Sequence, residues 1–175
     1  MFTTRHFTAT GFVINKDKVL LHWHPKVQAW LPPGGHIEEN EDPVQAVLRE
    51  IEEETGVIAQ IVPTNSTLDI KYPSQVFSPF TIMLEDINDP NTGYHQHIDM
   101  IYFCYLSEAS SGIKDGWIWV SKEEVASGKE LRYGVPPFKA PPEDVRLLSA
   151  SAFEMVEKYK DAVVNCESCD RPSVW

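Results

Sequence analysis

Cysteine is scarce in this chain, with only 3 among 175 residues, at Cys104, Cys166 and Cys169. Small secreted domains that depend on disulfides carry far more cysteine than this. The sequence therefore excludes a disulfide framework and favours a reducing, cytoplasmic setting. The one Cys-x-x-Cys pair, at 166 and 169, lacks the second pair of ligands that a structural zinc site needs.

Long apolar runs and an excess of basic charge are also missing. No stretch approaches the roughly 18–20 apolar residues that a membrane-spanning helix requires, and residues 1–10 lack the layout of a signal peptide. The formal net charge of −11 argues against a general nucleic-acid surface, which would be basic. We therefore expect no membrane or nucleic-acid partner, and a monomer or a homodimer. If the ligand is a phosphate ester, a bound divalent cation would have to supply the missing positive charge.

What the sequence does contain fits one globular domain. Its 42% hydrophobic and 11% aromatic residues can bury one sizeable core. We expect this domain over residues 1–164, with a mobile tail over 165–175. Turn residues and apolar patterns predict strands at 7–13, 18–24, 28–31, 57–62, 80–84, 98–106 and 116–120, and helices at 43–55, 121–125 and 143–161. This order predicts an α/β fold with a mixed sheet and a helix on each face.

The helix at 43–55 has the clearest boundaries. Asp42 is a good N-cap, Pro43 suits the first helical position, and Gln45 can close a capping box. Gly56 is the expected residue just past the C-terminus. Apolar side chains repeat at helical spacing and predict one buried stripe, formed by Val44, Val47, Leu48, Ile51 and Thr55.

Three glutamates of this helix, Glu50, Glu53 and Glu54, share a face beside the buried stripe. In a cleft, at about 6 Å and an effective dielectric near 20, each pair would repel by roughly 2–3 kcal/mol. Arg49 can reach Glu53 and neutralise one charge at most. A hard divalent cation would neutralise two more, and Mg²⁺ prefers carboxylate oxygens. The pattern predicts a Mg²⁺ site suited to pyrophosphate hydrolysis; a solvated glutamate-rich face is the competing interpretation.

The segment 35–57, GHIEENEDPVQAVLREIEEETGV, resembles the Nudix box. That pattern is Gly, five residues, Glu, seven residues, then Arg-Glu-aliphatic-x-Glu-Glu-x-Gly-aliphatic. A chance match is on the order of 10⁻⁹ per starting position at average residue usage. The preceding WLPPGG at 30–35 also looks like the family's approach to its box. The chain supplies every box position, with Gly35, Glu41, Arg49, Glu50, Ile51, Glu53, Glu54, Gly56 and Val57.

The resemblance implies an α/β/α sandwich and cleavage of a nucleoside diphosphate linked to another group. It implies that Glu50 and Glu54 hold the principal Mg²⁺ ion, with Mn²⁺ as a substitute, and that the Gly35 carbonyl contributes. Glu53 would bind a metal or orient the attacking water, and Arg49 would position Glu53. Family members differ in the number of metal ions and in the general base, so both stay open here.

Two further acids are candidates for an extra metal ligand. Glu41, just before the helix, would support the loop or hold a second ion. Several family members take another carboxylate from a loop well after the box. Glu85, with Asp86 and Asp89, stands in a predicted acidic loop that could provide it. An ordinary solvated turn is the alternative for this segment.

Substrate contacts are predicted from Gly34, His24, Lys26 and His97. Gly34 leaves room for a phosphate to approach the backbone. His24 and Lys26 precede a predicted strand and could meet phosphate or base, although a plain hairpin surface is equally natural.

His97 belongs to an alternating set with His95 and Asp99, whose side chains should share one face of a strand. Two histidines and an aspartate could ligate a metal ion, and His97 could instead contact the substrate or act as a base. The alternative is a polar strand entrance beside a cleft.

Three functions stay open at this point. The first is a pyrophosphohydrolase acting on ADP-ribose, a dinucleotide or a nucleotide sugar. The second is a hydrolase of ordinary or oxidised nucleoside triphosphates, and the third is a sensor that binds nucleotide without turnover. The intact box argues against the sensor. Beyond the box, Pro73 resembles the ADP-ribose type of member and Tyr72 the dinucleoside polyphosphate type, so the substrate is undecided.

Overall fold

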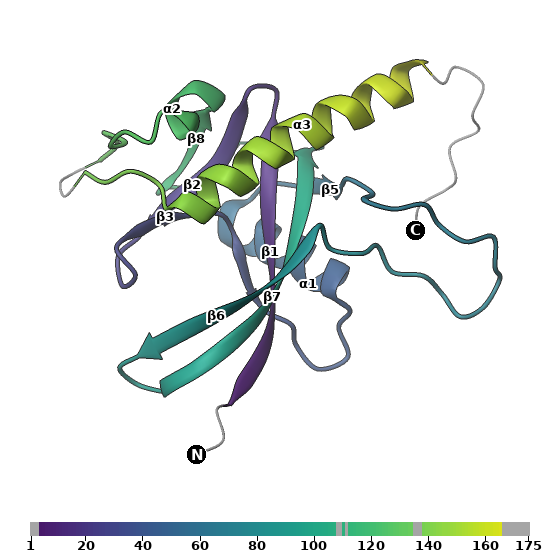
Figure 1. Cartoon of the computed structure of the whole chain (residues 1–175), viewed down its shortest axis with the longest axis horizontal. Helices are drawn as coiled ribbons and strands as arrows, with labels where there is room; N and C mark the ends of the chain where they lie inside the picture. Colours follow the sequence, from purple (N-terminus) through teal and green to yellow (C-terminus); the bar gives the residue numbers. More distant parts are fainter. Residues whose placement is uncertain (1–3, 108–109, 111, 135–137, 166–175) are drawn as a thin grey trace.

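The computed structural model describes residues 4–107, 110, 112–134 and 138–165 (Figure 1). The predicted tail begins at Asn165, which is the last residue of the C-terminal helix. Residues 166–175, with both tail cysteines, lie outside the described residues. The elements are β1 (Arg5–Asn15), β2 (Lys18–His24), β3 (Ala29–Leu31), β4 (Gly34–His36), α1 (Pro43–Thr55), β5 (Ala59–Ile61), β6 (Thr81–Asp89), β7 (Gly93–Leu106), β8 (Trp117–Ser121), α2 (Lys122–Ala126) and α3 (Glu143–Asn165).

The strands form one mixed sheet. Its main order is β3-β2-β1-β7-β5, with β4 added to β1, β6 to β7 and β8 to β2. The neighbours β1 and β7 run parallel, and the other pairs are antiparallel. In Figure 1, α3 crosses the near face of the sheet and α1 lies behind it. The predicted α/β/α sandwich is confirmed.

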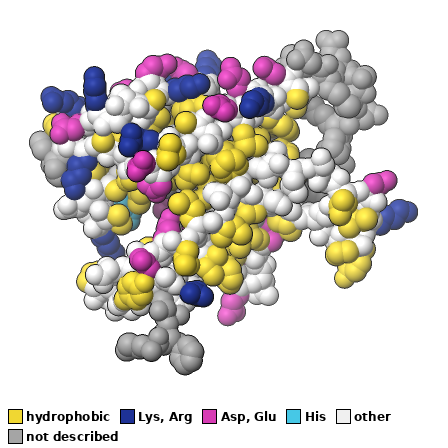
Figure 2. Space-filling view, in the orientation of Figure 1, with side chains coloured by type: hydrophobic (Ala, Val, Ile, Leu, Met, Phe, Trp, Pro, Cys, Tyr) yellow, Lys and Arg dark blue, Asp and Glu magenta, His cyan; other side chains and the backbone are white. Residues whose placement is uncertain are grey.

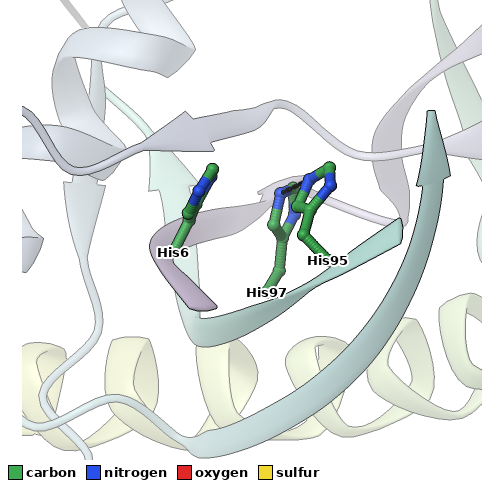
Figure 3. A group of neighbouring side chains, drawn as sticks. All are labelled: His6, His95 and His97. Atoms are coloured by element: carbon green, nitrogen blue, oxygen red, sulfur yellow. Dashed lines mark hydrogen bonds between the residues drawn. The ribbon is translucent and has the colours of Figure 1, made fainter. Parts of the chain in front are cut away.

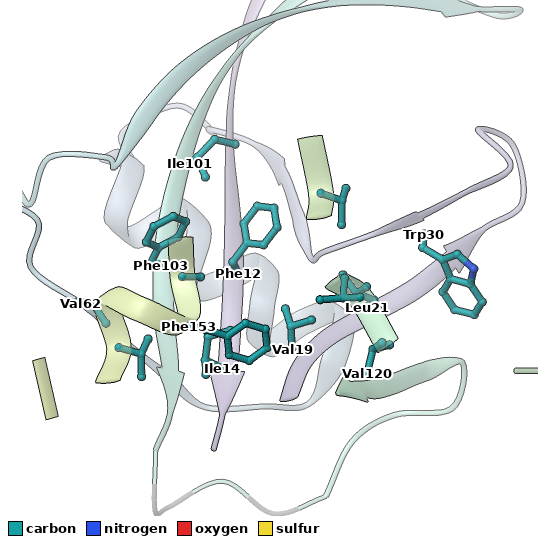
Figure 4. Close-up of a cluster of buried hydrophobic side chains, with 14 of the residues drawn as sticks. Phe12, Ile14, Val19, Leu21, Trp30, Val62, Ile101, Phe103, Val120 and Phe153 are labelled. Carbon is teal, nitrogen blue, oxygen red and sulfur yellow. The ribbon is translucent and has the colours of Figure 1, made fainter. Parts of the chain in front are cut away.

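Alternation along β1 divides the core into two layers. Phe12 and Ile14 face α3, where they pack with Phe103 and Phe153 (Figure 4). On the other side, Ala9 and Val13 pack against α1. At Gly11 an added Cβ would lie 2.7 Å from the Cδ1 atom of Ile51, so only glycine lets α1 approach β1 this closely. This close packing holds α1 firmly against the sheet.

The predicted boundaries of α1 are confirmed. The Asp42 carboxylate accepts hydrogen bonds from the backbone N–H groups of Val44 and Gln45, and the Gln45 side chain accepts one from Asp42 N–H at 2.9 Å. Gly56 ends the helix in the left-handed conformation, at φ 74°. These caps satisfy backbone groups that the helix leaves open at its ends.

The β6–β7 hairpin is longer than the sequence predicts. Glu85, Asp86 and Asp89 belong to β6, so the predicted acidic loop is wrong. The apolar pattern of the sequence does not predict the added length, because the side chains in this part of the hairpin are polar and form pairs across the two strands. Asp86, for example, accepts hydrogen bonds from the Tyr94 hydroxyl at 2.5 Å and from the Gln96 amide at 2.9 Å. Such cross-strand pairs stabilise a hairpin without burial of apolar side chains.

The surface combines charge with uncovered apolar side chains. Figure 2 shows a band of hydrophobic side chains across the middle of the face that carries α3, with charged residues gathered above it. On β6, Ile82 and Leu84 are 58% and 57% exposed. None of the helices in the described part of the chain has the length and apolar character that a membrane crossing needs.

Candidate active site

The glutamates of α1 meet the glycines of β4. The Glu50 carboxylate lies against Gly35 so closely that any side chain there would collide with it. One turn further along the helix, the Glu54 carboxylate accepts a hydrogen bond from Gly34 N–H at 3.2 Å. The side chain of Glu50 is only 16% exposed. The two acids are therefore held against the edge of the sheet and do not extend into solvent.

The pairing register between β4 and β1 determines which of the two glycines has a backbone carbonyl free to face the glutamates. Ala9 pairs with Gly35 and Thr10 with Gly34. Ile37 N–H, two residues beyond Gly35, donates to the backbone carbonyl at position 7 of β1 at 3.0 Å. Because hydrogen-bonding direction alternates along an antiparallel ladder, the polar backbone groups of Gly35 point toward β1 and those of Gly34 point away from it. The Gly34 carbonyl therefore points to the same side of β4 as the Gly34 N–H, which donates to Glu54 on the helix.

Arg49 connects the acids of the box. Its guanidinium donates to both oxygens of Glu41, at 2.7 and 3.0 Å, and to Glu50 at 2.9 Å. It also reaches Glu53 at 3.2 Å and the His36 carbonyl at 3.1 Å. The hydrogen bond from Arg49 holds the pKa of Glu41 below its usual value. The expected contact of Arg49 with Glu53 is present, but the carboxylate that Arg49 binds in a bidentate way is that of Glu41.

Glu53 and Glu54 have different surroundings. The side chain of Glu53 is 63% exposed and stands at the outer side of Arg49. Glu54 is half-buried, and this burial raises its pKa, as does the neighbouring charge of Glu50, whereas the Gly34 N–H lowers it. Two close carboxylates with one raised pKa form an oxygen-rich site that favours a hard cation. Glu50, Glu54 and the Gly34 carbonyl could hold it.

A second set of acids lies on the α3 side of the sheet and is called the acid strip here. It consists of Glu85 and Asp99, with Thr8 and Thr10 beside them. Asp99 is only 4% exposed and accepts a hydrogen bond from the Thr8 hydroxyl at 2.9 Å. Burial raises the pKa of Asp99, and burial followed by the charges of Asp99 and Asp144 raises the pKa of Glu85 to about 7. The Glu85 carboxyl can therefore carry a proton and donate a hydrogen bond near neutral pH.

The acid strip adjoins the glycines through Thr10. The Thr10 hydroxyl occupies the position that a side chain at Gly34 would need. The strip and the glutamates therefore approach Gly34 from different sides. On the α1 side of the sheet, next to the loop that precedes α1, is a hollow of about 430 Å³, lined by Phe7, Ile37, Glu38, Glu39, Glu41, Pro43 and Met100.

The structure brings His97 close to the box but keeps His24 and Lys26 on the β2–β3 hairpin. The ring of His97 lies 5.0 Å from that of His36, the residue after Gly35. Burial, and then its histidine neighbours, lowers the pKa of His97 to about 4. No hydrogen bond or ion pair among the described residues joins His24 or Lys26 to α1.

A family model described as the NUDIX domain matches residues 4–140. The chain belongs to the NUDIX family. The resemblance carried by residues 35–57 is thereby confirmed, and the matched region contains α1, β4 and the whole acid strip.

One solved structure and two curated proteins are similar to this chain. A crystal structure of a NUDIX-family hydrolase from Clostridium perfringens is 31% identical, with a TM-score of 0.67 over 87% of this chain and 99% of that one. A probable DHNTP pyrophosphohydrolase from Lactococcus lactis subsp. cremoris is 30% identical over 62% of this chain and 58% of that protein. An 8-oxo-dGTP diphosphatase from Haemophilus influenzae is 34% identical over 33% and 43%. The chain thus spans less than two thirds of either curated relative.

Proposed function

We propose that this NUDIX protein is a Mg²⁺-dependent hydrolase that cleaves a phosphoanhydride bond in a nucleoside diphosphate derivative. The observation that carries the proposal is the placement of Glu50 and Glu54 against the paired glycines of β4. A glutamate-rich helix face with no function would leave these carboxylates in solvent, where their mutual repulsion is small. Arg49 pairs with Glu50, but the half-buried Glu54 beside it has a raised pKa, so holding both carboxylates charged and adjacent is costly unless a further cation joins them.

The residues present fit Mg²⁺. Every donor is an oxygen, as this ion requires, and the same carboxylate and carbonyl oxygens also suit Mn²⁺. We assign the ion to Glu50, Glu54 and the Gly34 carbonyl. Gly34 takes the backbone role expected of Gly35 because its carbonyl faces away from β1. When bound, the ion supplies positive charge to the phosphates and acidifies a water molecule.

The remaining box residues have supporting roles in this proposal. Arg49 ties Glu41 and Glu50 together and leaves Glu53 at the open side of the site. An exposed carboxylate in this position is suited to orient the attacking water and accept its proton. Glu41 keeps the loop before α1 in place through its paired contact with Arg49, and it remains available to a second ion.

The substrate class that the observations favour is a nucleoside triphosphate with a bicyclic base. Two curated relatives are named for DHNTP and 8-oxo-dGTP. The acid strip adds a physical reason. The pKa of Glu85, raised to about 7, lets this carboxyl donate or accept a hydrogen bond near neutral pH, and the neighbouring Asp99 supplies further carboxyl oxygens for the edge of a base. A diphosphate bridged to a sugar or a second nucleoside is the other candidate, since its cleavage would need the same glutamate site.

A substrate panel tests both the activity and the class. The purified chain is assayed with Mg²⁺ against ADP-ribose, NADH, dinucleoside polyphosphates, ordinary triphosphates and 8-oxo-dGTP, with products identified by chromatography. A triphosphate substrate should yield a monophosphate and pyrophosphate, whereas a bridged diphosphate should yield two monophosphates. EDTA should abolish turnover, and added Mg²⁺ or Mn²⁺ should restore it. Turnover that persists without metal, or an inactive chain across the whole panel, would refute the proposal.

A further inference from the structure

Four of the six histidines of the chain converge at one end of the sheet. His6 comes from β1, and His95 and His97 come from β7 (Figure 3). The fourth, His36, ends β4. The parallel register places His6 beside His97. One ring nitrogen from each of His6, His95 and His97 lies within 4.8 Å of the other two. The fold thus gathers imidazoles that are far apart in the sequence, because the pairing of β1 with β7 brings them together.

The tautomer of His95 can be assigned from its partners. Its Nδ1 atom lies 3.1 Å from the Gly93 carbonyl, and a carbonyl oxygen can only accept. Nδ1 therefore carries the proton, so Nε2 of neutral His95 has a free lone pair. The Nε2 atom that bears this lone pair lies 3.3 Å from Nε2 of His97. Metal-binding histidines typically donate their second ring N–H to a carbonyl in this way.

His6 is oriented from the other side of the cluster. Its Nδ1 atom lies 3.2 Å from Nε2 of His36, and its ring stacks on that of His95 with 5.0 Å between centroids. His95 is 7% exposed, whereas His6 and His97 are half-buried. The cluster therefore has one buried member, His95, and two partly exposed members.

We propose that His6, His95 and His97 bind a transition-metal ion of the Zn²⁺ class, at a site separate from the glutamates of α1. Imidazole nitrogen suits Zn²⁺, Ni²⁺ or Co²⁺ and is a poor ligand for Mg²⁺. Tetrahedral Zn²⁺ with Zn–N bonds of about 2.0–2.1 Å places its ligand nitrogens about 3.4 Å apart. The 3.3 Å between His95 and His97 already meets this spacing. Three histidines leave the fourth position to water or to an incoming ligand.

The site differs from the glutamate site in position as well as in chemistry. The histidines lie on β1 and β7, whereas Glu50 and Glu54 lie on α1 at the outer edge of β4. Because the two sites use different ligands on different elements, we expect each to bind its ion without the other. The proposal does not depend on the hydrolase activity, because it concerns binding of the metal alone.

A Zn²⁺ titration of the full chain, monitored by calorimetry with excess Mg²⁺ present to occupy the glutamate site, tests the inference. We expect one tightly bound Zn²⁺ ion per chain, and Co²⁺ in its place should show the visible absorption of a tetrahedral site. His97→Ala and His6→Ala should each weaken Zn²⁺ binding at least about tenfold. His24→Ala is the matched control, because His24 lies on the β2–β3 hairpin outside the cluster, and it should bind Zn²⁺ like the parent.

Two results would overturn the proposal. One is Zn²⁺ binding that is unchanged in both His97→Ala and His6→Ala, with melting temperatures showing that both variants are folded. The other is Zn²⁺ binding that is lost in Glu54→Gln, which would place the ion among the glutamates. Hydrolysis lost in Glu54→Gln with Zn²⁺ binding intact would support two separate sites. Zn²⁺ binding by a parent chain that hydrolyses nothing would support the histidine site while the proposed activity fails.

Discussion

The glutamate site and the histidine cluster lie at neighbouring parts of one sheet but are assembled in opposite ways. The glutamate site comes from residues 34–54, whose spacing on one helix and one short strand brings the acids together. The histidine cluster joins His6 to His97 only because β1 and β7 run parallel in a particular register. The first is therefore encoded locally, and the second depends on the completed sheet. Substitutions should distinguish the two sites accordingly.

The largest expected effect is that of Glu54→Gln. This variant should lower turnover by about a thousandfold, because it removes a charged oxygen that we assign to Mg²⁺. Its melting temperature should stay the same or rise, since the half-buried carboxylate with a raised pKa is itself destabilising. Steady-state rates against Mg²⁺ concentration would measure the effect. Glu52→Gln, an exposed neighbour on the same helix, is the matched control, and equal losses in both variants would contradict the assignment.

Glu53→Gln should come next, with turnover reduced about a hundredfold through loss of a proton acceptor. Its folded state should melt within about a degree of the parent, because the side chain is 63% exposed. The dependence on Mg²⁺ should change less than in Glu54→Gln. Normal turnover in a destabilised Glu53→Gln protein would show that its role is structural.

Arg49→Lys should lower turnover by less than either glutamate variant, about tenfold, and should reduce the free energy of unfolding by about 1 kcal/mol. Lysine keeps the positive charge, but it cannot donate to both Glu41 oxygens and to the His36 carbonyl at once. Chemical denaturation and kinetics measured together would test this. Zn²⁺ binding by the histidine cluster should be unchanged, so a parallel loss of Zn²⁺ would mean that the two sites are coupled through His36.

The smallest effect is expected from Glu85→Gln in the acid strip. The pKa of Glu85 is about 7 in the folded protein, against an ordinary value of 4.5, so the folded state holds this proton more tightly than the unfolded state. Its contribution to stability is complete below about pH 4.5 and is lost as the pH rises toward about 7. Glu85→Gln should flatten the fall in melting temperature across this window. An identical pH profile in parent and variant would show that Glu85 ionises normally.

Much of the glutamate site can be predicted from sequence, for a physical reason. In a helix, the spacing between residues determines the directions of their side chains. Asp42, Gln45 and Gly56 predict where the helix begins and ends, and the relative positions of the glutamates are then determined. The orientation of Gly34 relative to Gly35 cannot be predicted in this way, because it depends on which residues of β4 are opposite β1. The two-pronged contact between the box arginine and the acid before the helix is equally hidden, because the loop between them has no periodicity.

The acid strip and the histidine cluster are less accessible to prediction. The alternation of His95, His97 and Asp99 indicates a shared face, and the structure places all three on β7. Their partners on β1, among them His6, reach them only through the parallel pairing of the two strands, so the sequence does not identify them. Only the position of His36 near the glutamate site could be inferred from the sequence, because His36 directly follows the first glycine of the box. Strand pairing over such separations is a tertiary property that local patterns do not contain.

The capping box at Asp42 also limits how this segment can vary in length. Because the cap fixes the first turn, every residue between it and Glu50 contributes about 100° of rotation. Inserting or deleting a single residue there would swing the carboxylates a quarter-turn or more away from the glycines. Only changes that preserve the count would keep the acids aimed at β4, so substitutions in this stretch should be tolerated far better than insertions or deletions.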